Sequence, residues 1–211
     1  GKFYMFASFK ADGVCRGTQI LVSEKPEGPY APLTSNPVTP PGWECLDGTL
    51  HVDEGGYPWM VFCHEWLQIN DGTICAMKLS QDLKCAEGEP VLLFHGSDAA
   101  WARPHQPGKY VTDGPFIHRA TDGSLLMLWS STGKEGYAMG IAKSANGRIT
   151  GPWKHVSEPI YGKDGGHGMI FKTFEGQLMM TLHRPNNTPD ERPVFMKIRE
   201  CNGGLERPSS V

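Results

Sequence analysis

The chain contains no long hydrophobic run and no marked excess of charge. None of its apolar stretches approaches the roughly 20 residues that a membrane-spanning helix requires, so we expect no membrane partner. Lys and Arg number 20 against 23 Asp and Glu, which gives a net charge of −3. A charge this close to zero provides no basic surface for nucleic acid, so we expect no nucleic-acid partner.

Several signatures of catalysis and metal binding are also missing. There is no GxSxG motif of a serine hydrolase and no glycine-rich phosphate loop. The six cysteines form no CxxC pair, which argues against a zinc ribbon. We expect reduced thiols, with Cys63 and Cys75 buried inside strands. No segment joins helix caps to a sustained apolar period of 3.6 residues, which indicates a nearly all-β chain.

The sequence is rich in glycine and proline, and it repeats itself. Its 26 Gly and 17 Pro lie between short apolar runs, where turns are expected. A polar start followed by two short strands recurs at a period of about 55 to 65 residues, which is typical of a propeller-like array of sheets. Full copies begin at Asp47, Asp113 and His167, which align at one position, and residues 1–8 match the second half of a copy.

Each repeat is predicted to form four short strands, the first two joined by a hairpin. We expect one domain over residues 1–211, with blades at about 1–42 (partial), 43–98, 110–160 and 161–211. The partial blade has strands at 2–8 and 19–22 and a Pro-rich edge at 30–40. The later strands are expected at 48–52, 58–64, 73–79 and 90–94; at 114–119, 124–130, 137–143 and 153–160; and at 168–172, 177–183, 194–199 and near Leu205.

Propeller geometry gathers polar residues at one mouth of the central channel. The start of the first strand and the end of the second strand of each blade lie on the same face of the disc. Asp47 and Asp113 should therefore meet the residues that end the second strands. A polar pocket with aromatic walls suits a sugar, whose faces are apolar and whose edges carry hydroxyls. The candidate substrate-binding residues are Trp43, His64, Glu65, Trp66, Trp129, Ser130, His167, His183 and Arg192.

The long connection over residues 95–110 is a second source of site residues. Loops of this length without regular structure are often functional. We expect its Trp101, His105 and Tyr110 to lie over the mouth of the pocket.

Converging carboxylates are what glycoside hydrolysis requires. One must be protonated to assist the leaving oxygen, and another must be ionised to activate water or attack the sugar. Crowding two such charges raises the pKa of one and keeps the other charged. The motifs that open the three full copies are Leu46-Asp47-Gly48, Thr112-Asp113-Gly114-Pro115 and Gly166-His167-Gly168. In order and spacing they resemble the motifs of glycoside hydrolase family 43.

The resemblance covers essentially the whole chain and implies a five-bladed β-propeller, of which about three and a half blades are present. It implies an inverting enzyme that cleaves arabinofuranosyl or xylosyl linkages of plant polysaccharides or oligosaccharides. By resemblance, Asp113 holds the general-acid position, where the family has Glu, and Asp47 tunes and orients that acid. His167 would lie at the channel axis, where some members hold a calcium ion or a water through an equivalent histidine.

The family's general base is an Asp in the first blade, which no residue of this sequence matches. We expect that base upstream of Gly1, and little hydrolysis by the 211 residues without it. Glu65 is an alternative proton donor at the same mouth. The competing interpretations are an ordinary turn for each Asp-Gly pair, a packed axial histidine for His167 and a surface charge for Arg192.

Two other functions compete with this one. The first is a propeller that binds carbohydrate without cleaving it. Asp113 in place of the family's Glu, and the lack of a residue that matches the base, would both allow this. The second is a glycosidase of a neighbouring five-bladed family with other sugars, such as fructosides or mannosides. Fold alone does not choose among them, and a panel of substrates would separate them.

Overall fold

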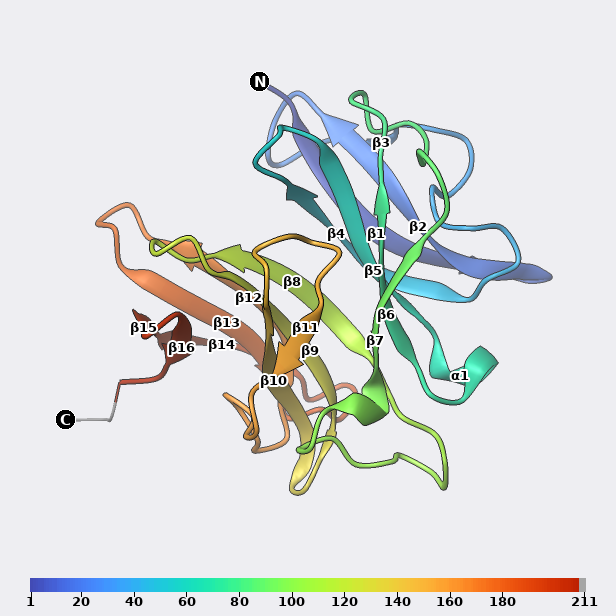
Figure 1. Ribbon diagram of the computed structural model, residues 1–211. Coiled ribbons are helices and arrows are strands. Elements are labelled where there is room, and N and C mark those ends of the chain that lie inside the picture. The colour runs from blue at the N-terminus through green and yellow to red at the C-terminus, as the bar shows by residue number, and fades with distance from the viewer. Residues whose placement is uncertain (209–211) are drawn as a thin grey trace.

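The computed structural model describes residues 1–208, and these are almost entirely β-structure, as predicted (Figure 1). Their strands form five antiparallel sheets. Within the described range, helical structure is limited to α1 (Trp66–Ile69) and the 3₁₀ turn η1 (Gly96–Asp98). No helix of the described residues has the length and apolar character needed to cross a membrane.

The sheets follow the predicted repeats closely. The partial blade contains β1 (Phe3–Ala11), β2 (Val14–Ser23) and β3 (Ala31–Pro32). The next two sheets have four strands each, namely β4 (Cys45–Val52), β5 (Pro58–His64), β6 (Thr73–Lys78) and β7 (Val91–His95), then β8 (Asp113–Arg119), β9 (Leu125–Gly133), β10 (Gly136–Ser144) and β11 (Trp153–His155). The last blade has β12 (Gly166–Lys172), β13 (Leu178–Arg184) and β14 (Arg192–Lys197).

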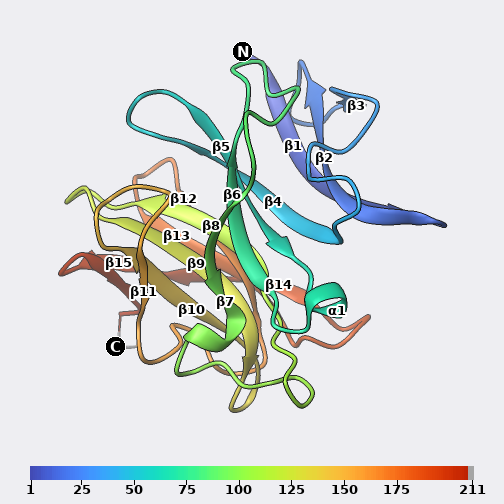
Figure 2. The same cartoon turned by 45° about the vertical axis from the view of Figure 1, so that its right-hand side comes forward.

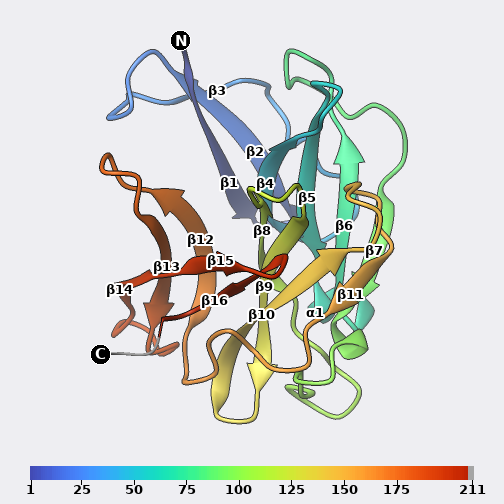
Figure 3. The same ribbon diagram turned by 60° about the vertical axis from the view of Figure 1, so that its left-hand side comes forward.

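The four blade sheets lie side by side around a common centre, with β1, β4, β8 and β12 innermost (Figure 2, Figure 3). Strand β4 lies beside β1 on one side and β8 on the other, and β12 lies beside β8. Each of these four sheets then continues outward in chain order. This is the arrangement of propeller blades, and it brings the starts of β4, β8 and β12 together.

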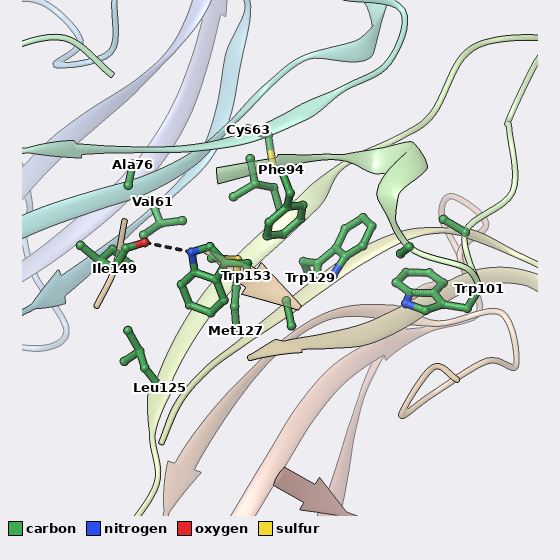
Figure 4. Packing of buried hydrophobic residues seen from close by; sticks show 14 of the residues in the cluster. Val61, Cys63, Ala76, Phe94, Trp101, Leu125, Met127, Trp129, Ile149 and Trp153 are labelled. Atoms are coloured by element: carbon green, nitrogen blue, oxygen red, sulfur yellow. Dashed lines mark hydrogen bonds between the residues drawn. The ribbon is translucent and has the colours of Figure 1, made fainter. Parts of the chain in front are cut away.

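Strand β9 is buried on both faces and joins two blades. Trp129 and Met127 pack toward the β4–β7 sheet with Phe94 and Trp101 (Figure 4). Leu126 and Leu128 belong to the cluster on the other side, shared with β12 and β13. Alternate residues of a strand point to opposite faces, so a continuous apolar run is what a strand between two blades requires.

The fourth strand expected near Leu205 is a wrong prediction. Strands β15 (Arg199–Cys201) and β16 (Gly204–Glu206) pair with each other in a separate hairpin instead of extending the β12–β14 sheet. Glu200 explains this, because its carboxylate accepts hydrogen bonds from Nε2 of His118 at 2.8 Å and from the amide of Thr121 at 2.8 Å. The hairpin is thus tied to the neighbouring β8–β11 blade.

This tie predicts an acid-sensitive contribution to stability. Partial burial opposes ionisation of Glu200, but the hydrogen bonds from Thr121 and His118 outweigh it and lower the pKa of Glu200 from 4.5 to about 2. A depressed carboxyl pKa stabilises the fold above the ordinary pKa, and this contribution is lost as the pH falls from 4.5 toward 2. Glu200→Gln should lower the free energy of unfolding at pH 6 by on the order of 1–2 kcal/mol.

The measurement is denaturant unfolding at a series of pH values. We expect the Glu200→Gln chain to lose less stability between pH 5 and pH 2 than the unsubstituted chain. The exposed Glu158 provides the control, since Glu158→Gln should leave the pH dependence unchanged. Parallel acid profiles for Glu200→Gln and the parent would contradict this role of Glu200.

Candidate active site

Each inner strand that opens a full repeat carries a β-bulge near its first residues. At the bulge the backbone enters the left-handed region, with φ of 57° at Asp47, 54° at Gly114 and 54° at His167. Residues other than glycine seldom adopt this conformation, and a bulge re-aims the side chain that it carries. The bulges thereby take Asp47 and His167 out of the regular alternation of the sheet.

The positions of the bulges show that the sequence alignment of Asp113 with Asp47 and His167 is wrong by one residue. Gly114, and not Asp113, is equivalent to Asp47 and His167, while Asp113 is the paired residue just before the bulge, opposite Ser130. A side chain at position 114 would place Cβ 2.8 Å from Cδ2 of His167, so glycine is required there. The two acidic residues therefore occupy different positions in their blades and have different surroundings.

Asp47 and His167 line a cavity of about 330 Å³ between the inner strands. The amide of Gly114 donates a hydrogen bond to Oδ2 of Asp47 at 3.0 Å, and the amide of Asp47 donates to Oγ of Ser8 at 2.9 Å. These bonds fix Asp47 to the blades on both sides. The cavity wall consists of Phe6, Ser8, Asp47, Gly48, Thr49, Gly114, Pro115, Phe116, His167, Gly168 and Met169.

Asp113 lies next to the carboxylate of Asp47, because the amide that donates to Asp47 belongs to Gly114, the residue after Asp113. Burial and the negative charge of Asp47 raise the pKa of Asp113 from 3.8 to about 7, against the opposing effects of His167 and Tyr137. The phenol of Tyr137 donates a hydrogen bond to Oδ2 of Asp113 at 2.9 Å. Asp113 is consequently a carboxylic acid that keeps its proton up to near-neutral pH.

Two histidines complete this cluster. Nδ1 of His167 lies 3.8 Å from Oδ2 of Asp47, and the His167 amide donates a hydrogen bond to Oγ of Ser130 at 2.8 Å. The His183 ring stacks on Tyr137 with a centroid separation of 5.6 Å and lies 6.3 Å from the His167 ring. The structure thus brings Asp47, Asp113, His167 and His183 together around one mouth, as the sequence predicts.

Sequence reasoning missed Tyr137 and gave no role to Ser8 in holding Asp47. Tyr137 is the second residue of β10, and the repeats show no polar aromatic at the same place. The available signal was topological. A third strand starts where the second strand ends, so a tyrosine at its beginning lies at the same mouth.

The aromatic rim lies outward from the carboxyl pair. Trp43 stacks on His64 with ring centroids 4.2 Å apart, and Trp66 packs against His105 at 5.2 Å. The expectation for the 95–110 connection is wrong for Trp101, which is buried in the core between blades, and for Tyr110, which packs against that core. For His105 it stays a prediction.

Two predicted substrate contacts, Trp129 and Ser130, are wrong. Trp129 and Ser130 are completely buried, Trp129 because it faces the core between blades and Ser130 because its hydroxyl holds the His167 amide. Arg192 is exposed, and its guanidinium donates to the carbonyls of Pro189 and Glu191 in its own loop, so its contact with substrate stays a prediction.

Glu65 is not the alternative proton donor. It is buried, and its Oε1 lies 2.9 Å from Nη1 of Arg16. Its carboxylate is therefore engaged by Arg16, whereas the carboxyl of Asp113 lies beside Asp47 and accepts the hydrogen bond of Tyr137. Of the two candidates for general acid, the surroundings favour Asp113.

The donors around His167 do not fit a calcium ion. Calcium takes six to eight oxygen ligands, whereas the described lining of this cavity offers Asp47 as its one carboxylate. Within residues 1–208 no group of three or more His, Cys, Asp or Glu side chains is arranged to hold a metal.

The family model for glycosyl hydrolases family 43 matches residues 1–201. The chain belongs to this family. As a family 43 member it is a glycosyl hydrolase, which sets aside the neighbouring five-bladed families weighed above. No curated protein matches the chain.

Solved structures agree with the family 43 assignment. An endo-arabinase from Bacteroides thetaiotaomicron is 48% identical over 96% of this chain and 73% of its own, with a TM-score of 0.92. A thermostable family-43 glycoside hydrolase is 22% identical over 99% of this chain and 72% of its own, with a TM-score of 0.85. An α-L-arabinofuranosidase from Lactobacillus brevis is 16% identical over 99% and 72%, with a TM-score of 0.75. The last two show the fold alone.

Proposed function

We propose that this glycosyl hydrolase cleaves arabinofuranosyl linkages of plant polysaccharides or oligosaccharides by single displacement with inversion. The observation that carries the proposal is the pair of unlike carboxyl groups, with the pKa of Asp113 raised to about 7 beside Asp47. The 48% identity to an endo-arabinase supports arabinose over xylose as the sugar.

In the proposed mechanism Asp113 is the general acid. Its Oδ2 accepts the hydrogen bond of Tyr137, which leaves Oδ1 to carry the proton that is given to the glycosidic oxygen. The bond from the anomeric carbon to that oxygen breaks while a water attacks from the opposite face and loses its proton to a base. Asp47, held by Gly114 and Ser8, opposes early ionisation of Asp113 and so keeps the acid ready.

The water-activating base is assigned, by family resemblance, to a carboxylate outside residues 1–211. Asp47 is not used for this role because its negative charge is needed to raise the pKa of Asp113. Activity measurements should therefore be made on the protein that contains both this chain and the base.

The stereochemistry of the first product tests the proposal. Proton NMR of the reaction on an α-L-arabinofuranosyl oligosaccharide should show the β-anomer of the released sugar first, since single displacement inverts the anomeric centre. A xylosyl oligosaccharide serves as the matched substrate and should be cleaved at least about tenfold more slowly. Initial release of the α-anomer would overturn the mechanism, and faster xylosyl cleavage would overturn the substrate. Binding without any cleavage would indicate a carbohydrate-binding propeller.

A further inference from the structure

A second cavity, of about 450 Å³, lies between the first residues of β2 and the loop that leads into β4. It shares no lining residue with the cavity of Asp47 and His167. The two are close nevertheless, because the Gly48 amide in the β4 bulge donates a hydrogen bond to Oγ1 of Thr18, which follows the β2 part of the lining. The lining consists of Val14, Cys15, Arg16, Gly17, Asn36, Pro37, Thr39, Pro40, Pro41, Gly42 and Trp43.

Trp43 forms a fixed aromatic wall of this second cavity. One face of its indole stacks on His64, with an interplanar angle of 12°. Gln68 holds both partners, since its Oε1 lies 2.7 Å from Nε2 of His64 and accepts the Glu44 amide at 2.8 Å, while its Nε2 donates to the Gly42 carbonyl at 2.9 Å. Both neighbours of Trp43 in the chain are thereby fixed, and Trp43 also packs against the core cluster that contains Ile20. The part of the indole that lines the cavity is preorganised for a flat apolar ligand surface.

Arg16 supplies hydrogen-bond donors in the same cavity. A guanidinium has five N–H donors, and among the described residues Glu65 is the acceptor that it meets. The charges around it cancel, because Arg16 pairs with Glu65 at 2.9 Å and Lys10 pairs with Glu44 at 2.6 Å. A neutral ligand with hydroxyl groups suits these surroundings better than an anion.

We propose that the cavity walled by Trp43 and Arg16 is a subsite for a further unit of a neutral glycan chain whose cleaved bond lies at Asp113. The sugar face would pack on the part of the Trp43 indole that lines the cavity, and its hydroxyls would accept hydrogen bonds from Arg16. This inference rests on the proposed function and deepens it, because such a subsite makes the enzyme select chains over short glycosides.

The experiment measures binding by this chain, which needs no catalytic base. Short and long linear arabino-oligosaccharides are titrated while NMR follows the indole N–H of Trp43 and the ring of His167, and calorimetry gives the affinity. We expect long oligosaccharides to shift both signals and short ones to shift His167 alone. Trp43→Ala should lower affinity for the long oligosaccharide about tenfold and leave the short one unchanged, with Gln68→Ala giving a smaller loss in the same direction.

Phe174→Ala is the matched control, since Phe174 is a fully exposed aromatic in the turn at the other end of β12. If long oligosaccharides shift His167 but neither move the Trp43 signal nor lose affinity in Trp43→Ala, the subsite is refuted and the proposed function stands. If no arabino-oligosaccharide shifts His167 or Trp43, the proposed substrate fails and the subsite fails with it. A Trp43 shift produced by oligogalacturonate and not by arabino-oligosaccharides would overturn the neutral ligand.

Discussion

Asp113→Asn should lower kcat by about 10²- to 10⁴-fold, the range contributed by a positioned general acid, in the protein that carries this chain together with its base. The amide of Asn cannot give a proton to the leaving oxygen. It retains an oxygen that accepts the Tyr137 hydrogen bond, so folding should be preserved. The measurement is the steady-state rate on an arabino-oligosaccharide at pH 6, beside a thermal unfolding scan.

Two comparisons separate loss of the acid from general damage. Asp122→Asn changes a carboxyl group in the hairpin turn at the far end of the same blade, where Asn supports the same turn, and it should leave kcat unchanged. On an aryl arabinoside with a highly acidic leaving group, kcat of Asp113→Asn should come close to kcat of the parent on the same substrate, because such a group departs without a proton. Equal rates for Asp113→Asn and the parent on the oligosaccharide would remove Asp113 from the mechanism.

Asp47→Asn should move the basic limb of the pH–rate profile to lower pH. Activity at pH 7 should fall by about tenfold for every pH unit that the limb moves. Burial is the first cause of the raised Asp113 pKa and the charge of Asp47 is the second, so removing that charge lowers the pKa without restoring it fully. An acid with a lower pKa is protonated over a narrower range, and activity is lost sooner as the pH rises. The Asn oxygen can still accept the Gly114 amide.

Tyr137→Phe provides the opposite change at the same carboxyl. It removes the hydrogen bond that holds down the pKa of Asp113, so the basic limb should move to higher pH. Damage to the site would lower kcat in both variants but would not move the two limbs apart. Limbs that move in the same direction, or not at all, would contradict the electrostatic account of the pair.

The sequence predicts the blades well because their signals are local. Alternating apolar runs and glycine turns place β4, β5, β8, β9, β12 and β13 near their observed bounds. The convergence of Asp47 and Asp113 followed from the topology of a blade and the family resemblance.

The errors arise where neighbouring blades decide the outcome. Nothing in the sequence marks the bulge that makes Gly114, and not Asp113, equivalent to Asp47. The sequence places Trp129 at the mouth because it lies beside Ser130 near the end of a strand, but a strand between two blades buries both faces and leaves neither side chain exposed. Tyr137 gains its importance only from a contact with another strand, over 24 positions of sequence.

The most direct test is a carbon NMR titration of this chain with labelled aspartate, in which the Asp113 carboxyl is assigned by comparison with Asp113→Asn. The account predicts that this carboxyl titrates at about pH 7 and that its midpoint falls in Asp47→Asn. Titration of Asp113 near the ordinary value of 3.8, unaffected by Asp47, would contradict the claim that the two carboxyl groups form an acid held ready by its neighbour.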